Sequence, residues 1–127
     1  MELNKQTAEL ALEKASESNP GAWVDHSRYV AEACKNIAWH CKHLSAGQAY
    51  IFGLLHDIGR YAGVSSEKHL IDGYRYCMER GWEKMAQICI SHAFMIQDIN
   101  TSIGKFDMND EDYLFMKEFV ENAVYDD

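Results

Sequence analysis

The apolar residues of this chain recur at intervals of three and four along much of its length, the spacing of helices that bury one face. The clearest case runs from about Trp23 to His40, where Val30, Ala33 and Ile37 follow one another at this spacing. No segment alternates between apolar and polar residues as a half-buried strand does. The sequence therefore predicts an all-α fold.

Start and stop signals divide this pattern into about six helices. The breaker cluster Asn19-Pro20-Gly21 ends the first, Ser45 is a candidate N-cap for the third, and Gly81 is a good C-terminal stop for the fourth. In the last helix, the side chains predicted to be buried are Tyr113, Met116, Phe119 and Val120. The expected helices cover about 4–18, 23–40, 45–60, 65–81, 83–96 and 110–123.

Length and charge limit the class of protein. A chain of 127 residues with 47% hydrophobic residues can bury one core, so we expect a single domain over residues 1–127. The net charge of −8 would repel a phosphate backbone, which argues against a nucleic-acid polymer as partner. The apolar run from Ala49 to Leu55 is too short to cross a bilayer, and the first residues do not resemble a secretory signal. We therefore expect no membrane partner and a cytoplasmic location.

The cysteines contain no Cys-x-x-Cys pair, and most of them fall on apolar sides of the expected helices. We interpret them as reduced, packed thiols. They are Cys34, Cys41, Cys77 and Cys89.

Most of the histidines fall on the apolar faces of the expected helices, as judged from the residues three, four and seven positions away. The inward-facing ones are His26, His56, His69 and His92. His40 and His43 instead lie at the end of the second helix, where a cationic side chain suits the helix C-terminus, and we interpret them as structural. A single inward histidine is most simply a hydrogen-bonded core residue, but four of them weaken that interpretation.

Asp57 also follows an apolar surface, and an ionised carboxylate is costly to bury without a cation. Arg60 could supply the charge through an ion pair, which would be a purely structural explanation. A divalent metal bound by Asp57 and several imidazoles would account for the carboxylate and the histidines together. His56 and Asp57 diverge by about 100° on a regular helix, but both can reach one ion near a helix end, where Gly59 would let the backbone depart from α geometry.

The string Gly-Leu-Leu-His56-Asp57-Ile-Gly59-Arg60 resembles the defining motif of the HD superfamily of metal-dependent phosphohydrolases. His26 resembles the upstream metal histidine of that family. His69 and His92 resemble the histidines of the next two helices. The resemblance covers about residues 21–96, with the helix expected at 110–123 lying beyond it.

This resemblance implies an all-helical domain that holds one or two divalent metal ions, with iron, manganese, zinc, nickel, cobalt and magnesium all open. By residue, it implies that His26, His56 and Asp57 bind the first ion, and that Asp57 bridges to a second ion held by His69 and His92. Two such cations can lower the pKa of a water and stabilise an in-line phosphoryl displacement.

Arg60 stands where the family often has lysine or arginine. It is a candidate to hold the substrate phosphate. A surface position or an ion pair with Asp57 stays equally open for it. On this interpretation, Asp57 and Arg60 are the catalytic candidates.

Two departures from the family pattern matter. Ala93 follows His92 where relatives often have paired histidines, so the second metal is expected to be weak or absent. The late aspartate that completes the first site in the family has no clear counterpart here. The other aspartates near the C-terminus fall in a loop, at a helix start or at the chain end: Asp98, Asp107, Asp110, Asp112, Asp126 and Asp127. Either residues beyond Asp127 supply that ligand or the site is naturally incomplete.

Three functions follow from this pattern. The first is hydrolysis of a phosphate ester in a nucleotide or another small phosphorylated metabolite, the substrate being the only expected partner. The second is a metal- or nucleotide-binding regulatory domain with little turnover, which an incomplete site would favour. The third is a helical interaction module in which the histidines only pack.

Overall fold

The computed structural model describes residues 2–123, and in that span the chain forms helices and loops without a strand. The all-α prediction is thereby confirmed. In chain order the elements are α1 (Lys5–Ser18), α2 (Ala22–Trp39), α3 (Ala46–Leu55), the 3-10 helix η1 (Ile58–Ala62), α4 (Lys68–Glu79), α5 (Glu83–Ser91), the 3-10 helix η2 (Ile99–Thr101) and α6 (Asp110–Asn122).

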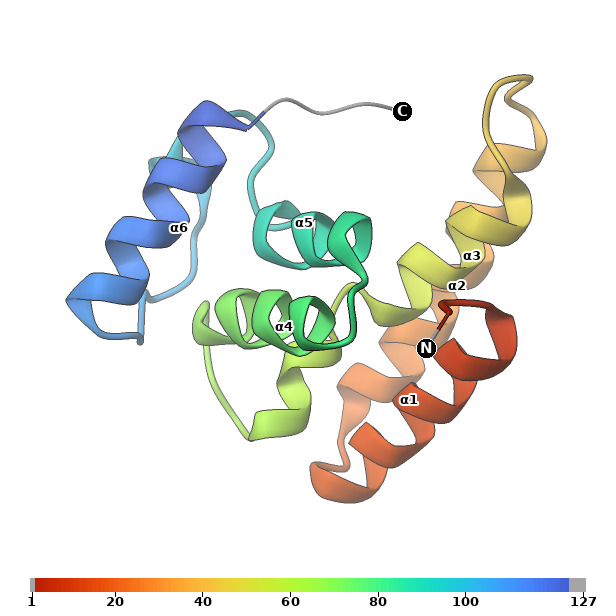
Figure 1. Ribbon diagram of the computed structural model, residues 1–127, viewed down its shortest axis with the longest axis horizontal. Coiled ribbons are helices and arrows are strands. Elements are labelled where there is room, and N and C mark those ends of the chain that lie inside the picture. The colour runs from red at the N-terminus through yellow and green to blue at the C-terminus, as the bar shows by residue number, and fades with distance from the viewer. Residues whose placement is uncertain (1, 124–127) are drawn as a thin grey trace.

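The helices form three groups, which Figure 1 shows side by side. Helices α1, α2 and α3 pack together on one side, α4 and α5 form a pair in the middle, and α6 lies beyond that pair. The short helix η1 follows α3 and packs against both α1 and α4. None of the helices within residues 2–123 combines the length and hydropathy that crossing a membrane requires.

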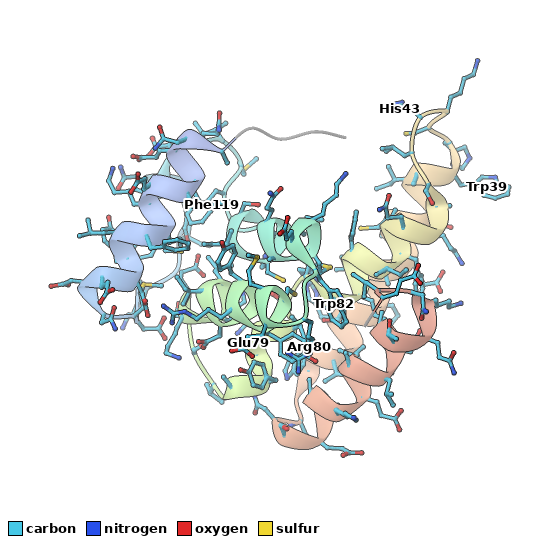
Figure 2. All side chains as sticks on the ribbon, in the orientation of Figure 1. Trp39, His43, Glu79, Arg80, Trp82 and Phe119 are labelled. Atoms are coloured by element: carbon cyan, nitrogen blue, oxygen red, sulfur yellow. The ribbon has the colours of Figure 1, made fainter. Side chains whose placement is uncertain are left out.

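Two apolar clusters hold these groups together. The larger joins α1, α3, α4 and α5, and Trp82 contributes to it from the turn between α4 and α5 (Figure 2). The smaller joins α4 and α5 to α6. Met116 and Val120 are fully buried there, with Tyr113 and Phe119 packed against them as the sequence predicts.

Side chains cap the starts of α1, α3 and α6, and the cap of α3 is the Ser45 that the sequence predicts. Asn4 caps α1, the Ser45 hydroxyl accepts from the Gln48 N–H at 3.1 Å, and the Asn109 side chain accepts from the Asp112 N–H at 2.8 Å. After α4 the chain turns at Gly81, whose φ of +75° is one that glycine adopts without strain. Local side-chain chemistry therefore sets these boundaries.

Three other boundaries differ from the prediction. The third helix ends at Leu55 instead of about Arg60, and the fifth at Ser91 instead of about Ile96. In each case the histidine that follows the helix hydrogen-bonds a backbone carbonyl of the last turn through its ring Nδ1, His56 to Gly53 and His92 to Cys89. The side chain thus satisfies a carbonyl at the helix end. The fourth helix begins at Lys68 instead of about residue 65.

The predicted buried stripe of the second helix is wrong. Ala33 is exposed and Ile37 is 65% exposed, whereas α2 buries Ser27, Ala31 and Ala38. The reason is the closeness of α3, because a Cβ placed on Gly53 would lie 2.8 Å from the Ala31 Cα. Only small side chains fit at such a crossing, so Ala31 lies there, while the larger Tyr29, Ile37 and Trp39 of α2 are exposed.

Candidate metal centre

The adjacent residues His56 and Asp57 stand where one helix ends and another begins. His56 follows the last residue of α3, and Asp57, with φ −105° and ψ 17°, precedes η1. The change of backbone direction removes the 100° divergence that a continuous helix would impose. Both side chains can therefore face the same point.

The Asp57 carboxylate is the centre of the cluster, and its side chain is only 7% exposed. Its Oδ1 lies 3.1 Å from the Nε2 atoms of both His69 and His92. Its Oδ2 lies 3.4 Å from the Nε2 of His56 and 3.7 Å from that of His26. Each carboxylate oxygen thus faces its own pair of imidazoles.

Backbone carbonyls orient three of the four rings. The Nδ1 atoms of His56, His69 and His92 lie 2.6, 2.6 and 2.9 Å from the carbonyl oxygens of Gly53, Ser66 and Cys89. A carbonyl oxygen can only accept, so each Nδ1 carries the hydrogen, and a neutral ring then presents the lone pair of Nε2. Metal-binding histidines commonly have this arrangement, in which a second hydrogen bond fixes the tautomer.

The four rings form a row from α2 across to α4. Ring centroids are 5.3 Å apart between His26 and His56, 4.9 Å between His56 and His92, and 5.4 Å between His92 and His69. The two ends of the row differ most in exposure, because the His26 side chain is 56% exposed and that of His69 is 4% exposed. The predicted inward face of His26 is therefore wrong, although its ring still reaches Asp57 from the margin of the site.

The buried carboxylate of the cluster is ionised and favours a cation beside it. Burial disfavours an ionised Asp57, but the imidazoles of His56, His69 and His92 outweigh burial and hold its pKa far below the usual range. Burial also disfavours a charged His56, yet the Asp57 carboxylate outweighs it and raises the pKa of His56. The carboxylate is therefore ionised, and the nitrogens around it need a proton or a metal between them and its oxygens.

One ring nitrogen of the cluster is left without a hydrogen-bond partner. Nε2 of His69 is buried and makes no hydrogen bond among the described residues, although it lies 3.1 Å from Asp57 Oδ1. A buried polar atom without a partner is costly, and coordination would satisfy it. Imidazole nitrogen with carboxylate oxygen is also a donor set that divalent transition metals accept. The residues therefore fit a metal ion.

Within the described residues, the candidate ligands form two triads that share Asp57. One contains His26, His56 and Asp57, and the other contains Asp57, His69 and His92; within each triad the donor atoms lie within 4.8 Å of one another. These five residues are the ones that the sequence predicts. His40 stays outside the cluster, with its Nδ1 2.8 Å from the Asn36 carbonyl of its own helix.

Arg60 lies at the edge of the cluster. Its Nε is 3.7 Å from Asp57 Oδ2, its Nη1 donates to the Ser65 carbonyl at 3.2 Å, and its side chain is 29% exposed. The ion pair considered from the sequence is thus present, but at 3.7 Å it is too long for a hydrogen bond. The guanidinium keeps donors for another anion.

The candidates for a late aspartate have other partners. Asp98 caps η2, Asp107 accepts from two backbone N–H groups at the start of α4, and the buried Asp112 pairs with Arg75. Asp110 is an exposed residue in the first turn of α6. Asp126 and Asp127 lie outside the described residues. Among residues 2–123, Asp57 is therefore the sole aspartate of the two triads.

Two features of the site could not be predicted from the sequence. A Cβ on Gly59 would lie 1.9 Å from the His69 carbonyl oxygen and 2.5 Å from the Gly73 nitrogen. Gly59 therefore permits η1 to pack against α4, which brings Asp57 to His69. The backbone does leave α geometry at this point, as expected, but the close packing is a second role that the sequence did not indicate. The contacts of Asp107 are the second feature, since no local signal links it to residues about forty positions earlier.

Comparison with known protein families gives a match over most of the chain. The sequence pattern of the HDOD domain family matches residues 7–105, a span that includes all five cluster residues. No curated protein and no solved structure gives a significant match. HDOD is an HD-like domain. This agrees with the all-helical fold and with the likeness of the motif around His56 and Asp57 to that of HD domains. The chain belongs to the HDOD domain family.

Proposed function

We propose that this domain binds two divalent metal ions through Asp57 and its four histidines and hydrolyses the phosphate ester of a nucleotide or another small phosphorylated metabolite. The observation that carries the proposal is the division of the Asp57 carboxylate between two pairs of imidazoles. A carboxylate that only accepted hydrogen bonds would not need two histidine pairs. In this proposal His26, His56 and Asp57 hold one ion, and Asp57, His69 and His92 hold the other.

The chemistry of such a pair is suited to phosphoryl transfer, because divalent cations lower the pKa of water and offset charge on phosphate oxygens. The chain itself supplies the orientation. The Gly53, Ser66 and Cys89 carbonyls fix three rings before any ligand arrives, so little rotamer entropy is lost on binding. The buried Asp57 adds a negative charge that partly offsets the cations.

Arg60 is the residue that we assign to the substrate. Its guanidinium has five N–H donors, and the contacts to Asp57 and the Ser65 carbonyl leave others for phosphate oxygens beside the cluster. The net charge of −8 favours a small substrate held by a local cation over a nucleic-acid polymer. Arg60→Ala should raise KM more than it lowers metal content.

A regulatory domain that binds metal or nucleotide with little turnover is the second candidate. It is favoured by the first triad, which has only three protein ligands among residues 2–123 and includes the half-exposed His26. Such a site would hold an ion loosely. The HDOD match is compatible with either candidate.

The test compares the metal content of the untreated chain with that of a His56→Ala, Asp57→Ala double variant. We expect between one and two ions per parent chain and none in the variant, because both triads lose ligands. His40→Ala is the matched control, since it removes an imidazole that bonds the Asn36 carbonyl of its own helix and is in neither triad. The absence of metal in the parent, even after reloading, would refute the proposed site.

Hydrolysis then separates the two candidates. The metal-loaded parent is screened against phosphorylated metabolites with each of several divalent ions. Turnover that disappears in the double variant and persists in His40→Ala supports the phosphohydrolase. Stoichiometric metal without turnover of any substrate class supports the regulatory domain.

A further inference from the structure

We propose that Asp107 is a positioning residue for the cluster, and that the segment 102–107 holds the His69 ring in its metal-binding orientation. This inference adds a residue to the account of the metal site, and its expected effect on metal affinity rests on the proposed function. Its geometric part concerns the metal-free chain and can be tested separately.

The N-terminus of α4 has no cap of its own. Glu67, the residue before the helix, makes no side-chain cap hydrogen bond. Asp107 takes this role from a distant part of the chain, because its Oδ2 and Oδ1 accept from the backbone N–H groups of Ser66 and Lys68, both at 2.7 Å. A carboxylate in this position satisfies unpaired donors and complements the positive end of the helix dipole.

The same segment makes three further contacts with the residues before α4. The Lys105 carbonyl accepts from the Glu67 N–H at 2.9 Å, and the Lys105 N–H donates to the Ser66 hydroxyl at 2.8 Å. The Ser102 hydroxyl donates to the buried Glu67 carboxylate. The backbone N–H groups of three consecutive residues, 66, 67 and 68, are thus all held by residues 105–107.

One peptide unit transmits this constraint to the cluster. The Ser66 carbonyl and the Glu67 N–H belong to the same planar unit, so the hydrogen bond to Lys105 sets the direction of the carbonyl. That carbonyl accepts from Nδ1 of His69 at 2.6 Å. The direction of the carbonyl fixes the His69 tautomer and turns Nε2 toward Asp57.

The other rings do not depend on this segment. His56 and His92 bond carbonyls of α3 and α5, at Gly53 and Cys89, which lie in regular helices. His69 is the ring whose carbonyl belongs to a loop. Its orientation therefore needs support from outside the helix, and loss of Asp107 should affect His69 alone.

The test records long-range proton–nitrogen spectra of the histidine rings in the metal-free full chain, about two pH units above the ordinary imidazole pKa. We expect the Nδ1–H form of His69 in the parent and a mixture of both tautomers in Asp107→Ala. His56 and His92 should be unchanged. Asp98→Ala is the matched control, because Asp98 caps η2 in the same connection without touching α4.

A second variant protects the test against misfolding. Asp107→Asn keeps one acceptor oxygen, so it should fold and give a tautomer mixture between those of the parent and Asp107→Ala. An unchanged His69 in the folded variants would overturn the proposal. An equal change in His56 and His92, or in Asp98→Ala, would also overturn it, because the effect would then be a general loss of structure.

Titration with Mn²⁺ gives the consequence for binding. In Asp107→Ala the affinity of one ion should fall by about 10–100-fold, the usual effect of removing a residue that orients a ligand, while the other ion is unaffected. A parent that binds no Mn²⁺ would refute the metal site and leave the tautomer result standing. If the parent binds two ions and Asp107→Ala binds both with the same affinity as the parent, the role of Asp107 is refuted.

Discussion

Asp57 connects the two halves of the cluster, and the four histidines differ in how firmly they are held. His69 is buried and bonded to the Ser66 carbonyl, while His26 reaches Asp57 from an exposed position on α2. A ligand that is already oriented loses less entropy on binding. We therefore expect the triad of Asp57, His69 and His92 to bind its ion more tightly than the triad of His26, His56 and Asp57.

The sequence suggests the opposite order of affinities. There, the lack of a second histidine after His92 predicts that the ion held by His69 and His92 is the weaker one. The prediction is that His26→Ala and His92→Ala each lose one ion, and that His92→Ala loses the tighter one. Removal of a ligand should cost at least about 100-fold in affinity, the upper end for residues that only orient ligands. Calorimetric titration measures it, with His40→Ala as control. A complete loss of metal in both variants would indicate one ion shared by all four rings.

At the scale of elements, the contact between η1 and α4 positions the cluster. The space at Gly59 is bounded by backbone atoms of His69 and Gly73, which cannot rotate away as a side chain could. Any side chain there must push η1 from α4. Asp57 precedes η1 and His69 lies on α4, so the two would separate.

Gly59→Ala should therefore destabilise the chain by about 1–3 kcal/mol, as overpacking usually does, and weaken metal binding. Urea unfolding in the presence of a chelator measures the first effect. Gly47→Ala is the control, because its nearest neighbour would be 3.9 Å away on Ser45 and alanine is the better helix former by roughly 1 kcal/mol. Equal stability of the two variants would contradict the packing role of Gly59.

A polar contact ties the first three helices together. The Tyr50 hydroxyl on α3 donates to Glu9 on α1 at 2.7 Å, and Glu9 accepts from Arg28 on α2 at 2.9 Å. Burial and the Glu9 carboxylate raise the pKa of Tyr50 to about 12. The folded state thus favours the protonated phenol more than the unfolded chain does.

The sign of the pH effect follows from this shift. The contribution of Tyr50 to stability is complete below its ordinary pKa of 10 and is lost as the pH rises toward 12. Tyr50→Phe should lower stability at neutral pH and flatten the decline between these values, as measured by urea unfolding across that window. Tyr29→Phe, at a side chain that is 76% exposed, should decline like the parent. A parallel decline in Tyr50→Phe would refute the assignment.

At the scale of the whole molecule, the cluster joins helices from both sides of the larger core. Its residues come from α2, the junction of α3 and η1, α4 and the end of α5. They are spread from residue 26 to residue 92, so an unfolded chain cannot hold them together. A metal ion should therefore bind the folded state almost exclusively.

Each bound ion should raise the free energy of unfolding by about 2.7 kcal/mol when the free metal concentration is 100 times its Kd. Calorimetric melting with Mn²⁺ and with a chelator measures the difference, and a shift of several degrees is expected for a chain of this size. The His56→Ala, Asp57→Ala variant should melt at one temperature in both conditions. An equal shift in that variant would show that the ion acts elsewhere.

Much of the fold and of the candidate cluster could be predicted from the sequence, because the signals are local. Apolar spacing predicted the helical class, and Asn4, Ser45 and Asn109 cap their helices through neighbours three residues away. His56, His69, His92 and Asp57 stood out because polar groups on apolar faces need a partner, whereas the face predicted for His26 was wrong and its place in the cluster followed the resemblance to HD domains. These inferences needed no knowledge of which segments meet.

Only the tertiary structure decided the remaining features, because they depend on contacts between distant segments. The crossing at Gly53 determined which face of α2 is buried, and the contact at Gly59 brought Asp57 to His69. Asp107 caps a helix that begins 39 residues before it. Periodicity along the chain describes each helix separately, whereas the distance between two backbones depends on the side chains of both segments. That distance places the Asp57 carboxylate between two pairs of histidines.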